Sequence, residues 1–249
     1  MNGDVTRNHY DRLAATYDQN WAYSPEFLAW MTSCILRRLQ LSDGDLVADV
    51  GCGTGLYARG LAGHASAVVC AEPSARMLAQ VPRDDRLIPV AASAEDLAFG
   101  RVALPHDSYD AILLKEVLHH VDGRATVIGG LARLLKPGGR MLVVMLPTRI
   151  TYPLFRDALK VFAEHQPDPA DIAAAMRDAG LAAAVTQDSF PLAFAAERYL
   201  QMVRDRYMSL LSAFSDAELE AGADEIRRDH PGDPIEFTDT FAFVLGKKT

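Results

Sequence analysis

The 249-residue chain contains little cysteine, and this scarcity excludes several kinds of site. Its three cysteines, Cys34, Cys52 and Cys70, are odd in number and lack the spacing of metal ligands. They predict free thiols in a reducing cytoplasm, without a metal centre. The chain also lacks an apolar run of roughly 18 residues, and its first residues are polar. We therefore expect no membrane-spanning helix, no signal peptide and no membrane partner.

The chain also lacks an excess of positive charge. It has 25 Lys and Arg residues against 33 Asp and Glu residues, which gives a formal net charge of −8 at pH 7. A general nucleic-acid binder needs a positive surface, so we expect no nucleic-acid partner. The shares of 49% hydrophobic and 23% charged residues are typical of a globular domain. The chain is long enough to bury a full core.

The most informative stretch covers residues 47–55, where an apolar segment runs into a turn with Gly51, Gly53 and Gly55. Glycines let the backbone turn sharply and approach a ligand closely. The next apolar segment, 68–71, ends on Glu72, at the distance where an acidic side chain holds a ribose. A dinucleotide fingerprint would need a further glycine at position 56, which is Leu56. A nucleoside-containing cofactor without a pyrophosphate is therefore favoured over a nicotinamide dinucleotide.

Strand and helix patterns alternate along the first 150 residues. Strands are expected over 46–50, 67–71, 86–90, 109–114 and 140–146, and helices over about 54–63, 73–81 and 121–136. This alternation predicts an α/β fold with a mainly parallel sheet that helices cover on both faces. Later segments are expected to be helices over 152–166 and 170–179, a strand over 183–194, helices within 196–229 and a last strand over 237–245.

At these residues the sequence resembles the class I S-adenosylmethionine-dependent methyltransferases, of the small-molecule type. Residues 47–55 are similar to their first motif, and 72–78 to their ribose-binding segment. Residues 92–99 resemble the loop beside adenine. Further similarity lies at 118–121, after the fourth strand, and at 134–139, before the fifth. The resemblance implies a Rossmann-like, doubly wound, seven-stranded sheet. We interpret residues 1–249 as a single domain with a helical cap over the cofactor edge, formed by residues 8–40, 150–166 and 196–232.

The resemblance also implies where S-adenosylmethionine binds. Glu72 would accept hydrogen bonds from both ribose hydroxyls, and Asp49 would orient the turn or the cofactor's ammonium. Met77 would pack against adenine, whose edge Ser93 would border, although many relatives carry Asp there. The implied cofactor-binding residues are Tyr10, Tyr17, Asp49, Gly51, Cys52, Gly53, Gly55, Glu72, Pro73, Met77, Ser93, Ala94, Glu95 and Lys115. No metal is expected.

Two side chains are candidate catalytic residues. Tyr17, on a segment that resembles the family's entry helix with Tyr10, would contact the cofactor's carboxylate through its hydroxyl or the sulfonium through its ring. His119 could act as a base, because histidine titrates near neutral pH. The alternatives are a core aromatic and a histidine packed against loops. Lys115 and Glu116 depart from the family pattern: Glu116 could hold a cationic amine or the cofactor's ammonium, or the two could form an ion pair that shapes the pocket.

These observations favour a cytoplasmic small-molecule methyltransferase of secondary metabolism or cofactor biosynthesis, either a monomer or a homodimer. A second hypothesis keeps the cofactor but transfers or cyclises its aminocarboxypropyl chain, releasing methylthioadenosine. A third is a binding module that retains the cofactor without turnover. The products distinguish these hypotheses, since methyl transfer leaves S-adenosylhomocysteine.

Overall fold

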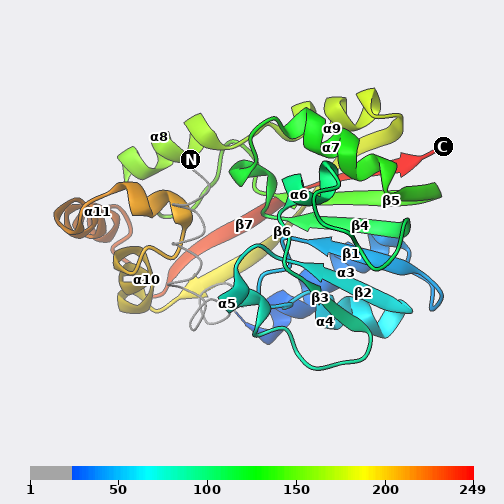
Figure 1. Cartoon of the computed structure of the whole chain (residues 1–249). Coiled ribbons are helices and arrows are strands. Elements are labelled where there is room, and N and C mark those ends of the chain that lie inside the picture. Colours follow the sequence, from blue (N-terminus) through cyan, green and yellow to red (C-terminus); the bar gives the residue numbers. More distant parts are fainter. Residues whose placement is uncertain (1–23) are drawn as a thin grey trace. The chain divides into compact units, whose positions relative to one another are not determined.

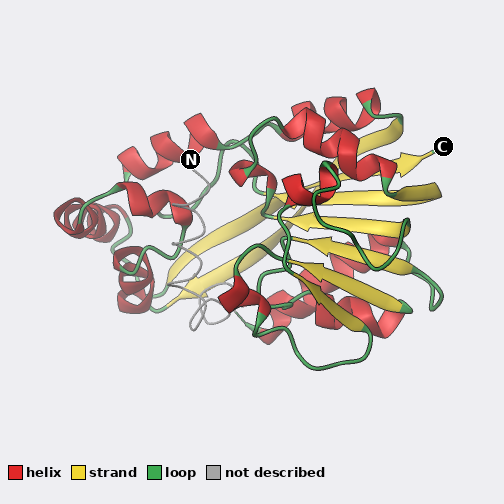
Figure 2. Cartoon of the chain, viewed as in Figure 1, coloured by secondary structure: helices red, strands yellow, loops and turns green. Residues whose placement is uncertain are grey.

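The computed structural model describes residues 24–249, so Tyr10, Tyr17 and the start of the predicted cap lie outside the described residues. The strands form one seven-stranded sheet in the order β3-β2-β1-β4-β5-β7-β6 (Figures 1 and 2). The strands are β1 (Leu46–Val50), β2 (Ala67–Ala71), β3 (Leu87–Val90), β4 (Tyr109–Lys115), β5 (Leu135–Met145), β6 (Leu181–Phe194) and β7 (Ile235–Lys248).

The sheet is mainly parallel. β1 pairs in parallel with β2 and β4, β2 with β3, and β4 with β5, whereas β7 runs antiparallel to β5. The chain order reverses between β1 and β4, and ligands of open α/β sheets bind beyond the carboxyl ends of the strands at such a point. The predicted fold class is confirmed, and the topology places a binding crevice next to the glycine turn after β1.

The chain divides into two compact units. Of the described residues, the first contains 24–145, 167–186 and 242–249. Its longer helices are α3 (Pro25–Leu39), α7 (Arg124–Arg133) and α9 (Pro169–Asp178). α7 packs against α9, against β5 and against the short α6 (Ala94–Ala98), whereas α3 packs against β5 and the short α4 (Ala58–Leu61). These helices bury a core of aliphatic side chains, including Ile112, Leu131 and Met141.

The second unit contains residues 146–166 and 187–241. It holds α8 (Arg156–His165), α10 (Ala196–Arg204), the 3-10 turn η3 (Ser209–Ala213) and α11 (Asp216–Asp229). It contains an aromatic cluster in which the Tyr199 ring lies near the rings of Tyr207 and Phe237. These helices agree with those expected within 152–166 and 196–229. The single-domain interpretation and the cap role of 8–40, 150–166 and 196–232 stay predictions.

Helix boundaries differ from the prediction where local chemistry intervenes. The expected helix over 54–63 is reduced to α4 and the 3-10 turn η1 (Ala62–His64), because the glycine turn continues to residue 57. The helix over 73–81 is only α5 (Ala75–Leu78), since the residue before Pro82 is disfavoured from helical conformation. The start of α3 follows its sequence signal: the Ser24 hydroxyl accepts a hydrogen bond from the Phe27 N–H.

The structure also answers two expectations drawn from composition. None of the three cysteines forms a disulfide. Among residues 24–249, no helix has both the length and the apolar character needed to cross a bilayer.

Packing of α6 against α7 requires a glycine at position 130. A Cβ atom built on Gly130 would lie 2.5 to 2.7 Å from three atoms of Ala98, whereas one on the neighbouring Gly129 meets nothing within 4 Å. We expect Gly130→Ala to lower the free energy of unfolding by about 1–3 kcal/mol through overpacking. Gly129→Ala, the matched control, should raise it by up to about 1 kcal/mol. Urea unfolding measures both, and equal effects would contradict the packing.

Candidate functional site

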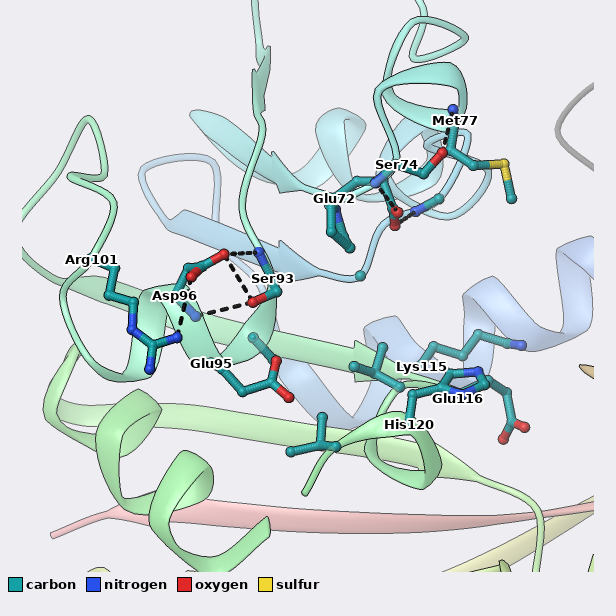
Figure 3. Close-up of a pocket in the computed structure, with 16 residues that line it drawn as sticks. Glu72, Ser74, Met77, Ser93, Glu95, Asp96, Arg101, Lys115, Glu116 and His120 are labelled. Carbon is teal, nitrogen blue, oxygen red and sulfur yellow. Dashed lines mark hydrogen bonds and ion pairs between the residues drawn. The ribbon is translucent and has the colours of Figure 1, made fainter. Parts of the chain in front are cut away.

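A cavity of about 450 Å³ opens at the carboxyl ends of β1, β2 and β4 (Figure 3). Its volume is within the range of small-molecule sites, roughly 300–1,000 Å³. The wall contains the glycine turn after β1, the turn after β2, the start of α6 and the residues that follow β4. Every lining residue belongs to the first compact unit.

The glycine turn forms one wall of the cavity. Gly51 has a φ of +74°, a conformation in which a side chain is strained, and a Cβ atom there would overlap the Val117 side chain. The N–H groups of Gly51 and Cys52 both donate to the carbonyl of Ala71, over N to O distances of 2.7 and 3.1 Å. The turn is therefore attached to the end of β2, and glycine at position 51 lets Val117, which also lines the cavity, pack against the turn.

Glu72 connects the two turns that border the cavity. Its carboxylate accepts hydrogen bonds from the Gly53 N–H at 3.1 Å and from the Ser74 N–H at 2.8 Å, one on each oxygen. The side chain lines the cavity although its residue is only 8% exposed. Because a carboxylate oxygen can accept more than one hydrogen bond, Glu72 retains acceptor capacity for two adjacent hydroxyls.

Asp49 lies behind the glycine turn, on β1, and does not line the cavity. The pKa of the Asp49 carboxyl is raised to about 7. Burial is the main cause, the Glu72 carboxylate adds to it, and the Lys115 ammonium opposes it. Asp49 therefore changes charge near neutral pH. Cys52 also lies outside the lining, and a hydrogen bond with Cys70 and burial raise the pKa of its thiol.

At one end of the cavity, Ser93 and Asp96 are engaged with each other (Figure 3). The Ser93 hydroxyl accepts the Asp96 N–H at 3.1 Å and donates to the Asp96 carboxylate at 2.9 Å, which caps α6. The Ser93 N–H also donates to that carboxylate and lowers its pKa. Arg101 lies 3.5 Å from Asp96. The hydroxyl of Ser93 thus caps the helix. A contact between Ser93 and a ligand would therefore be made by its backbone.

The opposite end is formed by Lys115, Glu116 and His120, which group together in Figure 3. The Lys115 ammonium lies 4.9 Å from the centre of the Tyr57 ring. Glu116 has a φ of +55°, which is uncommon for a residue with a side chain. Its N–H donates to the Val144 carbonyl at 2.8 Å, so the backbone there is still attached to the sheet.

His119 and His120 take different positions. Their ring centres are 3.8 Å apart, but His120 lines the cavity and His119 does not. Burial lowers the pKa of His119 to about 4, with further contributions from Arg124 and Lys115. His119 is therefore neutral at pH 7 and a weak base. Its catalytic role stays a prediction, and the structure adds His120 as a second candidate.

The cavity brings most of the predicted cofactor residues together. Those that line it are Gly51, Gly53, Glu72, Pro73, Met77, Ser93, Ala94, Glu95 and Lys115. Asp49, Cys52, Gly55 and His119 lie outside the lining. The lining also contains Glu116, for which the sequence suggested a contact with a cationic amine or the cofactor's ammonium. The remaining lining residues were not predicted to bind the cofactor: Ser74, Asp96, Arg101, Val117, His120 and Val121. Asp96 was detectable in the sequence, because Ser-x-x-Asp before an apolar residue is a capping pattern.

The residues present fit an adenosyl cofactor. The glycine turn supplies close backbone approach, Glu72 supplies the acceptor for a pair of hydroxyls, and Met77 supplies an apolar surface. No group of His, Cys, Asp and Glu among residues 24–249 is arranged to hold a metal ion.

Comparison with known proteins supports the same assignment. Residues 48–143 match the family model described as a methyltransferase domain. The chain is 33% identical over 153 residues to demethylmenaquinone methyltransferase of Tropheryma whipplei (strain Twist), covering 60% of this chain and 63% of that protein. It is 32% identical over 164 residues to ubiquinone biosynthesis O-methyltransferase of Xanthomonas oryzae pv. oryzae (strain PXO99A), covering 58% and 63%. The chain thus spans less than two thirds of the length of these curated relatives.

Solved structures show the same fold. Phosphoethanolamine N-methyltransferase 2 of Haemonchus contortus, solved in complex with S-adenosyl-L-methionine, has a TM-score of 0.62 at 19% identity. The match covers 97% of this chain and 59% of that chain.

Asp49 should make stability depend on pH. Its folded-state pKa of about 7 lies above the ordinary value of 3.8, so the folded protein holds a proton that the unfolded chain releases earlier. Loss of that proton costs stability as pH rises, and the cost is complete above the folded-state pKa. Asparagine does not titrate, so the free energy of unfolding of Asp49→Asn minus that of wild type should increase by about 2 kcal/mol from pH 5 to pH 8. Urea unfolding at both pH values checks this; a difference independent of pH would contradict it.

Proposed function

We propose that this chain, whose residues 48–143 match the family model described as a methyltransferase domain, is a class I methyltransferase that transfers a methyl group from S-adenosylmethionine to a small organic molecule. The observation that carries the proposal is the cavity in which Glu72 joins the glycine turn after β1 to the turn after β2. This arrangement offers backbone approach and a carboxylate to an adenosyl group. The names of the curated relatives, both methyltransferases, support it.

The cofactor would supply an electrophilic methyl group, activated by the positive sulfur to which it is bound. The chain's own residues then have three tasks. Glu72 and the glycine turn orient the ribose, Met77 and the α6 start hold the adenine, and the residues after β4 border the reacting end. Alignment of two reactants can account for a large part of the rate enhancement. Exclusion of water strengthens the electrostatic interactions in the site and prevents side reactions.

We further propose that the acceptor is a hydroxyl group. A hydroxyl must lose its proton as the new bond to carbon forms, and this requires a base within reach. His120 lines the cavity beside Glu116, at the end opposite Ser93 and Asp96 (Figure 3). The relative from Xanthomonas is named as an O-methyltransferase, which agrees with this choice. The cytoplasmic location, the monomeric or homodimeric state and the absence of nucleic-acid partners stay predictions.

The test is product analysis. Purified chain is incubated with S-adenosylmethionine and a panel of phenols, catechols, hydroquinones and hydroxylated macrolactones, and the products are followed by mass spectrometry. We expect S-adenosylhomocysteine together with an acceptor whose mass rises by one CH2 unit, because a methyl group replaces the hydroxyl proton. Methylthioadenosine as the product would instead indicate chemistry on the aminocarboxypropyl chain. Cofactor that binds but is not consumed with any acceptor would indicate a binding module. Either of these two results would overturn the proposal.

Glu72 should control cofactor affinity. We expect Glu72→Ala to weaken S-adenosylmethionine binding by about 1.5–3 kcal/mol, the value of a hydrogen bond to a charged group. Isothermal titration calorimetry measures the change. Glu72→Gln, which keeps one carbonyl acceptor and the side-chain length, should lose less. Unchanged affinity in the alanine variant would reject the ribose assignment, provided that its unfolding curve shows a folded protein.

The two histidines provide a matched pair for the base. We expect His120→Ala to lower kcat by about 10²- to 10⁴-fold, the usual contribution of a general base, with little change in cofactor affinity. His119→Ala should have a smaller effect, because the pKa of His119 is about 4 and its side chain does not line the cavity. Kinetics with the acceptor found above decide between them. A larger loss in the His119 variant, or full activity in both, would remove His120 from this role.

A further inference from the structure

Glu116 occupies an unusual place at the end of β4. It follows Lys115, the last residue of the strand, and its backbone has a φ of +55° while its N–H still donates to the carbonyl of Val144 on β5. Positive φ costs free energy for a residue with a Cβ atom, and such outliers often occur at functional sites. Here the strained backbone belongs to an acidic residue of the cavity wall.

Among the described residues, four acidic ones line the cavity: Glu72, Glu95, Asp96 and Glu116. Glu72 accepts the N–H groups of Gly53 and Ser74, and Asp96 is engaged by Ser93 and Arg101. These two carboxylates therefore have structural duties in the turns and in the helix cap. Glu116 lies at the opposite end, next to Lys115 and His120 (Figure 3). The Lys115 ammonium lies 4.9 Å from the centre of the Tyr57 ring.

The ends of the cavity indicate which part of the cofactor would meet Glu116. If Glu72 holds the ribose hydroxyls and the start of α6 borders adenine, the atoms beyond the ribose extend toward the residues that follow β4. Those atoms include the sulfur, which is positively charged in S-adenosylmethionine and neutral in S-adenosylhomocysteine. The amino-acid tail, by contrast, has the same charge in both molecules.

We propose that Glu116 discriminates the charged cofactor from its neutral product by electrostatic attraction to the sulfonium. This inference rests on the proposed function and deepens it by giving one residue a specificity role. The attraction ends when the methyl group leaves, because the sulfur then loses its charge. Glu116 therefore favours entry of fresh cofactor over retention of spent product, and it limits product inhibition.

The experiment compares two variants that differ only in charge. Glu116→Asp and Glu116→Asn have nearly equal size, and both residue types tolerate positive φ. Affinities for S-adenosylmethionine and S-adenosylhomocysteine are measured by isothermal titration calorimetry, without an acceptor. We expect Glu116→Asn to weaken S-adenosylmethionine binding about fivefold, as for one solvent-exposed ion pair, and S-adenosylhomocysteine binding less than about twofold. Glu116→Asp should keep most of the preference.

Glu95 provides the control within the same cavity. It lines the end near Ser93, so Glu95→Gln should leave the ratio of the two affinities unchanged. Added salt should reduce the wild-type ratio, because it screens exposed charges. Thermal melting and circular dichroism check that the Glu116→Asn variant is folded like the wild type. If it is not, Glu116→Gln, which has the length of glutamate, replaces it in the affinity measurements.

The outcomes are separable. Equal losses for both ligands in Glu116→Asn would mean that Glu116 holds the ammonium of the amino-acid tail, which overturns the inference. Unchanged affinity for both ligands would also overturn it while leaving the proposed function intact. Failure of the wild-type chain to bind either ligand would instead refute the proposed function.

Discussion

The hydrogen bonds of the Glu72 carboxylate join the two turns on which the rest of the cavity depends. One oxygen accepts the N–H of Gly53 and the other accepts the N–H of Ser74, so the ends of β1 and β2 are fixed relative to each other. The parallel pairing of these strands places the turns side by side, and the carboxylate converts proximity into a defined geometry. The same group that would bind a ribose also maintains the shape of its own site.

Electrostatics in this region are set by burial as much as by charge. Asp49 lies behind the cavity wall and Glu72 lies within it, so two buried carboxyl groups are close together. Burial and the neighbouring Glu72 carboxylate keep Asp49 partly protonated near neutral pH, which reduces the repulsion between them. At the other end, Lys115 offers the positive charge that lowers the pKa values of both Asp49 and His119. The proposed cofactor carries a cationic sulfur, which suits a cavity with several carboxylates.

Much of this could be predicted from sequence because the signals were local. The strand positions, the glycine turn and Glu72 follow from apolar runs, from glycine spacing and from the acidic residue after the second strand, and the family resemblance is confirmed by the domain match. Which of two adjacent histidines lines the cavity could not be predicted, because it depends on how the short 3-10 turn η2 (Leu118–His120) orients each ring. The positive φ of Glu116 also had no local signal, since glycine or asparagine usually marks such a position.

The partly protonated Asp49 has a consequence for binding thermodynamics. Any ligand that brings positive charge to this cavity stabilises the ionised carboxylate and so displaces a proton into solution. Association would then be linked to buffer protonation, and the apparent affinity for a cationic ligand would rise as the solution becomes more alkaline around pH 7. A neutral ligand would lack this linkage, so acidification of the solution would weaken recognition of the charged species selectively.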